Sequence, residues 1–128
     1  MSDKFTVEII SPDKSIIKED TTEVIIPAYE GEMGILKDHI SIITFLRPGI
    51  IKVLSDTERN FFVEEGTVEF ANNNLLILSS TAKELSKLER NSLNDLIAET
   101  EAKINDNKVS DREKYFLSYK LDTLKNIS

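Results

Sequence analysis

The 128-residue sequence contains no cysteine and only one histidine, four glycines and three prolines. The lack of cysteine excludes disulfide scaffolds, thiol nucleophiles and cysteine-based metal sites. No dense run of lysine or arginine is present and the formal net charge is -7, so neither nucleic acid nor anionic lipid is expected as a partner. The sequence also lacks a signal-peptide pattern and an apolar run of roughly 18 residues, so we expect a soluble, unprocessed, cytoplasmic chain without direct membrane insertion.

Charge and helix-breaking residues are unevenly distributed along the chain. Residues 1–81 contain 7 Lys/Arg and 14 Asp/Glu, whereas residues 82–128 contain 9 of each and neither glycine nor proline. A long segment without glycine or proline favours helix. We therefore predict two parts, a β-sandwich domain over residues 1–84 and a helical hairpin domain over residues 85–128.

Alternating apolar and polar residues in the first part indicate short strands. Phe5, Val7 and Ile9 show the pattern most clearly. With turn signals about every eight to twelve residues, the pattern is typical of an all-β sandwich, here of about eight to ten strands. The asparagines at 72–74 predict a turn with left-handed backbone, and the run that follows them is predicted to be buried on both faces. The other strands are expected near residues 15–18, 22–27, 40–46, 50–54, 59–63, 67–70 and 75–78.

The period of the apolar residues becomes helical after residue 84. Capping-box patterns at Ser86–Glu89 and Ser110–Glu113 predict the starts of two helices, with Thr81 as an alternative first start. A polar break over residues 105–109 separates the two segments. Helices joined by so short a connection are expected to pack as an antiparallel α-helical hairpin.

The stretch from Pro27 to Gly49 contains three of the four glycines, two of the three prolines and the only histidine. We predict constrained, irregular surface backbone from Pro27 to the apolar run that begins at Ile40. Pro27 is expected to end a strand or to lie at a sheet edge. The turn at residues 47–49 predicts a hairpin or a corner.

Little in the sequence supports catalysis or metal binding. The best catalytic pair is Asp38 and His39, but neighbours on extended backbone point to opposite sides, and no G-x-S-x-G motif is present. His39 is expected to bond to backbone instead. Glu30 and Glu32 are the nearest carboxylate pair and fit no calcium-loop spacing, and no phosphate-binding glycine motif is present. No catalytic residue, cofactor or metal is expected, and the residues alone favour a solvated turn over a contact site at Glu30 and Glu32.

Several motifs at fixed spacing resemble one family nearly end to end. They are Phe5–Pro12, Pro27 with Glu30–Leu36, His39, the Thr44-x-Leu46-x-Pro48-Gly49 series, Gly66 and the terminal helix pair. With these residues the chain closely resembles the epsilon subunit of bacterial F-type ATP synthase, in the central stalk. The resemblance implies a non-catalytic rotor subunit that joins the gamma subunit to the c-subunit ring and couples ion-driven rotation to ATP synthesis.

The resemblance also implies roles for individual residues. Contact with the basic polar loops of the c ring is implied for Glu30, Gly31, Glu32 and Met33, which reverses the preference for a solvated turn. Contact with gamma is implied for Ser11, His39 and Thr44. The implied location is peripheral, at the cytoplasmic face of the bacterial inner membrane.

The hairpin resembles an element that lies folded on the sandwich or extends along gamma to the alpha and beta subunits and restrains ATP hydrolysis. Family members that bind ATP carry an I/L-D-x-x-R-A motif, but this chain has Glu89 and Ser92 at the aspartate and arginine positions. We therefore expect no ATP sensing by the hairpin. The alternative function is a free-standing β-sandwich adaptor with the hairpin as its partner-binding arm, and an enzyme based on His39 comes third.

Overall fold

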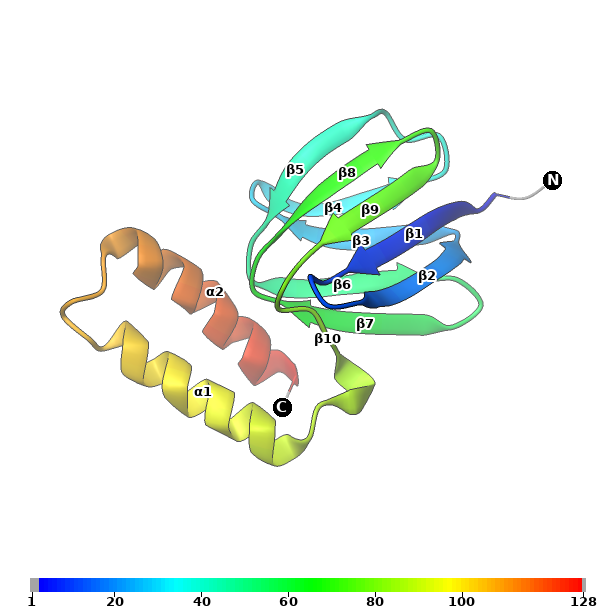
Figure 1. Cartoon of the computed structure of the whole chain (residues 1–128). Helices are drawn as coiled ribbons and strands as arrows, with labels where there is room; N and C mark the ends of the chain where they lie inside the picture. The colour runs from blue at the N-terminus through cyan, green and yellow to red at the C-terminus, as the bar shows by residue number, and fades with distance from the viewer. Residues whose placement is uncertain (1–2, 128) are drawn as a thin grey trace.

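Ten strands curl into a sandwich that is followed by two helices in the computed structural model, which describes residues 3–127 (Figure 1). The prediction of an all-β sandwich followed by a helical hairpin is confirmed. The strands are β1 (Phe5–Ile10), β2 (Ser15–Thr21), β3 (Glu23–Ala28), β4 (Gly31–Leu36), β5 (Ile42–Leu46), β6 (Gly49–Leu54), β7 (Glu58–Val63), β8 (Gly66–Ala71), β9 (Asn74–Leu78) and β10 (Lys83–Glu84). A 3-10 turn (Leu85–Lys87) leads to the helices α1 (Arg90–Ile104) and α2 (Asp111–Ile127).

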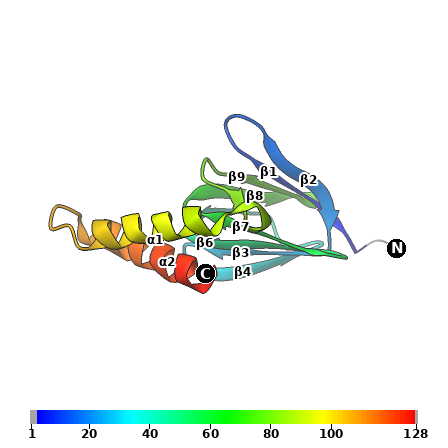
Figure 2. The same ribbon diagram turned by 90° about the horizontal axis from the view of Figure 1, so that it is seen from below.

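The strands are paired in the order β10-β7-β6-β3-β5-β8-β9-β1-β2, and β4 pairs with β3 outside this path. All of these pairs are antiparallel except β1 with β9. The sheet changes layer at β3, which pairs with β6 through Glu23–Ile25 but with β5 only at Ala28. Seen from below, the hairpin projects from one end of the two layers, and β1 begins at the opposite end (Figure 2).

Apolar side chains from both layers fill one core between them. In β1 the alternation is complete, because Phe5, Val7 and Ile9 are buried while the residues between them are half-buried. An edge-to-face contact joins the Phe5 and Phe70 rings, whose centroids are 5.6 Å apart. The 17 buried members are Phe5, Val7, Ile9, Ile17, Val24, Ile26, Ala28, Ile35, Leu46, Ile51, Val53, Phe61, Val63, Val68, Phe70, Leu75 and Ile77.

The prediction of irregular backbone after Pro27 is wrong for residues 31–36 and confirmed for residues 37–39, which lie between β4 and β5. Gly31–Leu36 forms strand β4, which pairs with β3 from Ala28↔Gly31 to Glu23↔Leu36. The glycine at 31 has φ +132°, a conformation that side chains disfavour, and it follows the two-residue turn between the strands. Glycine here builds a tight hairpin, and Ile35 anchors that hairpin in the core.

The segment around Pro27 and Gly49 forms a corner between the layers. Of the two alternatives predicted for the turn at residues 47–49, a hairpin or a corner, the corner is therefore confirmed. Strands β5 and β6 do not pair with each other but lie on either side of β3. Pro27 is the last but one residue of β3. It has no register partner on either β5 or β6. A Cβ atom added at Gly49 would lie 2.5 Å from Pro27 Cβ, so only glycine permits this close approach.

Two expectations for the segment around β9 have different outcomes. Asn72 and Asn73 have φ values of 52° and 58°, which confirms the left-handed turn. Burial of both faces of β9 is wrong, because Leu76 is half-buried and Leu78 is 45% exposed. The apolar residues on the outer side of β9 therefore belong to the surface.

The first predicted helix start is wrong and the second is confirmed. Residues 83–84 pair with β7, and α1 begins only at Arg90 with Glu89 as an N-cap that makes no side-chain cap bond. Glu84 remains extended because both of its carboxylate oxygens accept hydrogen bonds from the Arg59 side chain, at 2.9 and 3.2 Å. At the second start, the Glu113 N–H donates to Ser110 Oγ at 3.2 Å, which is one of the two hydrogen bonds of a capping box.

An ion-pair network closes the sandwich near the hairpin. Arg59 on β7 contacts Glu84 on β10 and Glu19 on β2, and these contacts join strands from the two ends of the strand order. The hydrogen bonds from Arg59 hold the pKa of the Glu84 carboxyl below its ordinary value, although burial opposes this shift. The same bonds raise the pKa of Arg59 against the effect of burial.

The hairpin packs against the β6–β7 end of the sandwich. Phe62, Leu93 and Leu124 form a second cluster of buried apolar residues, separate from the main core. Lys120 on α2 adds an ion pair with Glu64. Neither helix, within the residues that the structure describes, is long and apolar enough to cross a membrane.

Candidate partner-binding surface

The turn between β3 and β4 presents two carboxylates at the surface. Glu30 lies in the turn and Glu32 on β4, and both side chains are exposed. Because side chains alternate along a strand, Met33 points the other way and packs against the main core. The four residues expected at the c ring therefore lie together, but only the two glutamates present exposed side chains, and half-buried Gly31 contributes backbone.

Asp38 and His39 do not form a catalytic dyad. Asp38 has φ 65°, and its N–H donates to Asn73 Oδ1 at 2.7 Å while Asn73 Nδ2 donates to Asp38 Oδ1 at 3.0 Å. His39 Nδ1 lies 2.7 Å from the carbonyl oxygen of Ile40, to which it donates when protonated at that nitrogen. The expected bond from the histidine to backbone is confirmed.

Ser11, His39 and Thr44 are spread over one layer of the sandwich. Ser11 directly follows β1 and closes a local turn, since its Oγ donates to the Lys14 carbonyl at 3.1 Å. His39 lies before β5, at the other end of the layer, with its ring edge-on to Phe70 at 5.9 Å between centroids. Thr44 opposes buried Val68 and so lies on the inner side of β5. The structure does not bring these three residues into one cluster.

The outer face of the β5–β8–β9–β1 layer carries apolar side chains that the sequence reasoning missed. Ile43 and Phe45, on either side of Thr44, are 78% and 57% exposed. Strand register continues this face through Thr67 to Leu78 and Ile10 in one row and through Glu69 to Leu76 in the next. Exposed apolar groups of this extent are typical of contact surfaces. The signal in the sequence was the run at residues 42–46, which is apolar on both sides of the strand.

Helix α2 contacts the sandwich at Tyr29 and at Arg47, the two ends of a segment that includes Glu30–Met33, His39 and Thr44. The Tyr29 and Phe116 ring centroids are 5.4 Å apart, and Arg47 Cζ lies 4.2 Å from the centroid of the Tyr119 ring. The Tyr115 and Tyr119 hydroxyls are 3.0 Å apart, and this hydrogen bond raises the pKa of Tyr115. A cleft of about 430 Å³ lies between α2 and the sandwich, with Glu32 and Arg47 in its wall.

The donor set of this surface is not that of a metal centre. Within residues 3–127, no three His, Asp or Glu side chains are grouped closely enough to hold a metal ion. The surface combines a carboxylate-bearing turn with an exposed apolar face, which is suited to binding other macromolecules.

Comparisons with known proteins agree with this fold. The family described as "ATP synthase, Delta/Epsilon chain, beta-sandwich domain" matches residues 4–85. The ATP synthase epsilon chain of Pelagibacter ubique is 47% identical over the full length of both chains, and that of Sinorhizobium fredii is 33% identical over 81% of this chain and 79% of its own. A chain in the mitochondrial ATP synthase of Euglena gracilis, in a structure of OSCP, F1 and c-ring, shares the fold with a TM-score of 0.76 at 20% identity, over 98% of this chain and 79% of its own.

Proposed function

The chain belongs to the family of ATP synthase epsilon chains, and from this premise we propose that it is a non-catalytic rotor subunit joining the gamma subunit to the c ring. Its task is mechanical, since a rigid sandwich bound to both partners transmits torque from the ion-driven ring. The observation that carries the proposal is the presence of two chemically distinct exposed surfaces on one sandwich. One is the acidic β3–β4 turn, and the other is the apolar outer face of the β5–β8–β9–β1 layer.

We assign the c-ring contact to Glu30, Gly31, Glu32 and Met33. The two exposed carboxylates are suited to the basic loops that the family's c rings present, and Met33 supports the turn from the core. Glu32→Lys is expected to weaken binding to the detergent-solubilised c ring about tenfold at low salt, because the contact becomes repulsive. The matched control is Glu99→Lys, which reverses an exposed charge on α1 and leaves binding unchanged. Equal affinity of Glu32→Lys and wild type at low and physiological salt removes Glu32 from the contact.

We assign the gamma contact to the outer face, with Ser11 and His39 beyond its two ends and Thr44 on the inner side of β5, between Ile43 and Phe45. Ile43 and Phe45 supply the exposed apolar area that such a contact buries. Ile43→Ser is expected to reduce recovery of gamma in pull-downs from a bacterial membrane extract, while leaving c-ring binding intact. If the wild-type chain recovers an unrelated protein and no synthase subunit, the adaptor function is favoured instead.

The hairpin carries the regulatory part of the proposal, which is restraint of ATP hydrolysis through the alpha and beta subunits when extended. Glu89 and Ser92, at the start of α1, are both exposed and replace the aspartate and arginine of the ATP-binding motif. The hairpin accordingly does not sense ATP. Isothermal titration of the full chain with ATP should show no tight binding, and tight binding would refute this assignment. The protein is held peripherally at the cytoplasmic face of the inner membrane through its partners.

A further inference from the structure

One face of α2 contacts both ends of a single segment of the sandwich. Tyr29 is the first residue of the acidic turn, and its ring lies tilted against that of Phe116, while Arg47 lies directly after β5 and covers the Tyr119 ring. The segment between them, residues 29–47, contains the whole of β4 and β5. It carries all the c-ring residues assigned above and two of the three gamma residues.

The two ends of this segment meet where the sheet is weakly paired. Strands β3 and β5 share a single register pair, Ala28↔Leu46. Around it, the Tyr29 N–H donates to the Phe45 carbonyl at 3.0 Å, and the Arg47 N–H donates to the Pro27 carbonyl at 2.9 Å. Side-chain contacts from α2 therefore reinforce a junction at which the sandwich has few ladder bonds of its own.

The contacting face of α2 is itself an ordered aromatic cluster. The Tyr115 ring is edge-on to Phe116 at 5.8 Å and to Tyr119 at 4.9 Å between centroids, and the two tyrosine hydroxyls are hydrogen-bonded. The ring centroids of Tyr29 and Phe45 are 6.1 Å apart. Tyr29, within the acidic turn, therefore contacts both the apolar outer face and α2. Glu32 and Tyr119 line the same cleft. The turn and the helix thus share one continuous set of side chains.

We propose that α2 positions the acidic turn for its partner, with Phe116 and Tyr119 as positioning residues that act through Tyr29 and Arg47. The proposal rests on the proposed function, because the c ring is the partner whose binding reports it. When the contact of Phe116 with Tyr29 is lost, the turn also populates conformations that do not bind the c ring. The apparent affinity for the ring then falls in proportion to the fraction of molecules whose turn is in the binding conformation. Thermodynamic linkage makes this coupling reciprocal. If docking of the hairpin raises the affinity for the ring by a given factor, binding of the ring raises the equilibrium constant for docking by the same factor.

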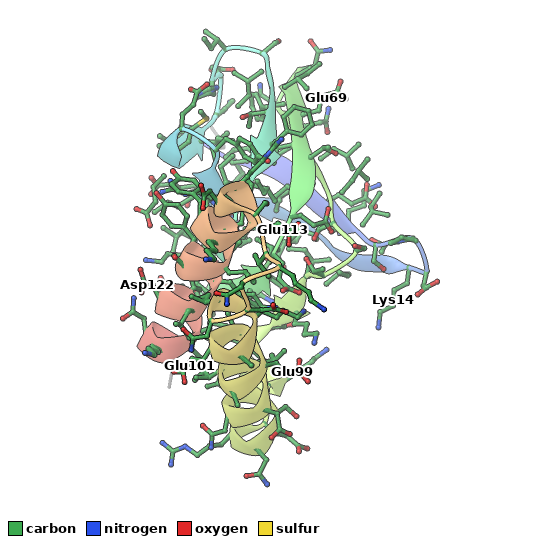
Figure 3. The ribbon with its side chains drawn as sticks, turned by 90° about the vertical axis from the view of Figure 1, so that its left-hand side faces the viewer. Lys14, Glu69, Glu99, Glu101, Glu113 and Asp122 are labelled. Carbon is green, nitrogen blue, oxygen red and sulfur yellow. The ribbon has the colours of Figure 1, made fainter. Side chains whose placement is uncertain are left out.

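A double-mutant cycle on the full chain tests the coupling. Affinity for the detergent-solubilised c ring is measured for wild type, Tyr29→Ala, Phe116→Ala and the double variant. Each single variant is expected to bind about fivefold more weakly, which corresponds to the coupling energy of one aromatic pair. The double variant should bind no more weakly than Tyr29→Ala alone. Asp122→Ala, an exposed change on α2 labelled in Figure 3, is the control expected to match wild type.

Two further measurements separate positioning from loss of structure. Phe116→Tyr keeps the aromatic contact and is expected to restore wild-type affinity. Hydrogen exchange of the α2 amides should slow by the same factor of about five on addition of the c ring to wild type, and should not slow in Tyr29→Ala.

Failure of the positioning role can be distinguished from failure of the proposed c-ring contact. If wild type binds the ring and Phe116→Ala binds equally well, or if the two single effects add fully, the positioning role is overturned while the rotor function stands. If Phe116→Tyr fails to restore binding, the positioning role is likewise overturned. If wild type itself does not bind the ring, the proposed c-ring contact fails, and the inference fails with it.

Discussion

The sandwich and the hairpin are stabilised in different ways. The sandwich encloses 17 buried apolar residues that are joined by continuous strand ladders. The hairpin contributes two of the three buried members of a second cluster, Leu93 and Leu124, and the third, Phe62, comes from β7. Half-buried Leu96, Ile97 and Ile127 of the helices pack against them. The other attachments of the hairpin are single contacts, such as the ion pair between Lys120 and Glu64. The sandwich therefore has a core sufficient for its own fold, whereas the helices depend on docking.

The exposed surface of the hairpin points to the same difference. Glu99 and Glu101 on α1 and Glu113 and Asp122 on α2 are all exposed, and Figure 3 shows them distributed along the two helices. One of the two buried residues of α1 is polar: Thr100, whose hydroxyl donates to the Leu96 carbonyl at 2.7 Å. A hairpin of this composition gains most of its stability from the sandwich, and this makes docking a property that a partner can change.

The largest expected effect is on the sandwich core. Phe70→Ala removes a ring that is 1% exposed and packs edge-on against Phe5, so we expect unfolding of the sandwich to cost about 3–5 kcal/mol less free energy. Urea denaturation followed by far-ultraviolet circular dichroism measures the change. Phe45→Ala is the matched control, because that ring is 57% exposed on β5, and its loss should cost well under half as much.

The next effect tests whether the two regions are separable. Leu124→Ala empties a fully buried position in the hairpin cluster, and we expect the docked hairpin to lose about 2–3 kcal/mol. Hydrogen exchange should then accelerate in α1 and α2 while the amides of the β8–β9 ladder keep their protection. Equal acceleration in both regions would show that sandwich and hairpin unfold as one cooperative unit.

Two glycines of the sandwich show whether its corner, at Gly49, or its β3–β4 turn, at Gly31, is the more constrained element. Gly49→Ala forces a Cβ atom against Pro27, so we expect a loss of about 2 kcal/mol from overpacking. Gly31→Ala has open space around its Cβ atom, and only its φ of +132° is unfavourable, so a loss of about 1 kcal/mol is expected. Thermal unfolding of both variants measures the difference. A larger loss for Gly31 would mean that the turn, and not the corner, is the more constrained element.

Much of the sandwich could be predicted from the sequence because burial there follows strand alternation. Phe5, Val7 and Ile9 are an example, since a single period determines both strand and face. Strand β4 could not be identified in this way, because two glycines interrupt its pattern and their effect depends on pairing with β3. The first helix start was missed for a similar reason, since the contact that keeps Glu84 extended comes from Arg59, 25 residues earlier.

The candidate site was predictable only in part. The exposed carboxylates Glu30 and Glu32 could be placed from the residues and the resemblance together. The apolar run at residues 40–46 indicated a strand, but because both of its sides are apolar, the side that faces the core depended on the pairing of β5 with β8. The contacts of α2 with Tyr29 and Arg47 join positions more than 70 residues apart in the sequence, and no local pattern encodes them.

The smallest effect concerns the ion pair on β10, the last strand of the sandwich before the hairpin. Hydrogen bonds from Arg59 lower the pKa of Glu84 from its ordinary value of 4.5, so this contact stabilises the folded chain when the pH is above that value. The stabilisation is lost as the pH falls through the lowered pKa, because the protonated carboxyl no longer pairs with the guanidinium. We expect Glu84→Gln to be about 1 kcal/mol less stable than wild type at pH 7, and this difference should shrink below pH 4. Urea titrations of both proteins across this range measure it, with Glu99→Gln as the exposed control. If wild type and Glu84→Gln differ by the same amount at every pH, the ion pair with Arg59 does not stabilise the folded chain.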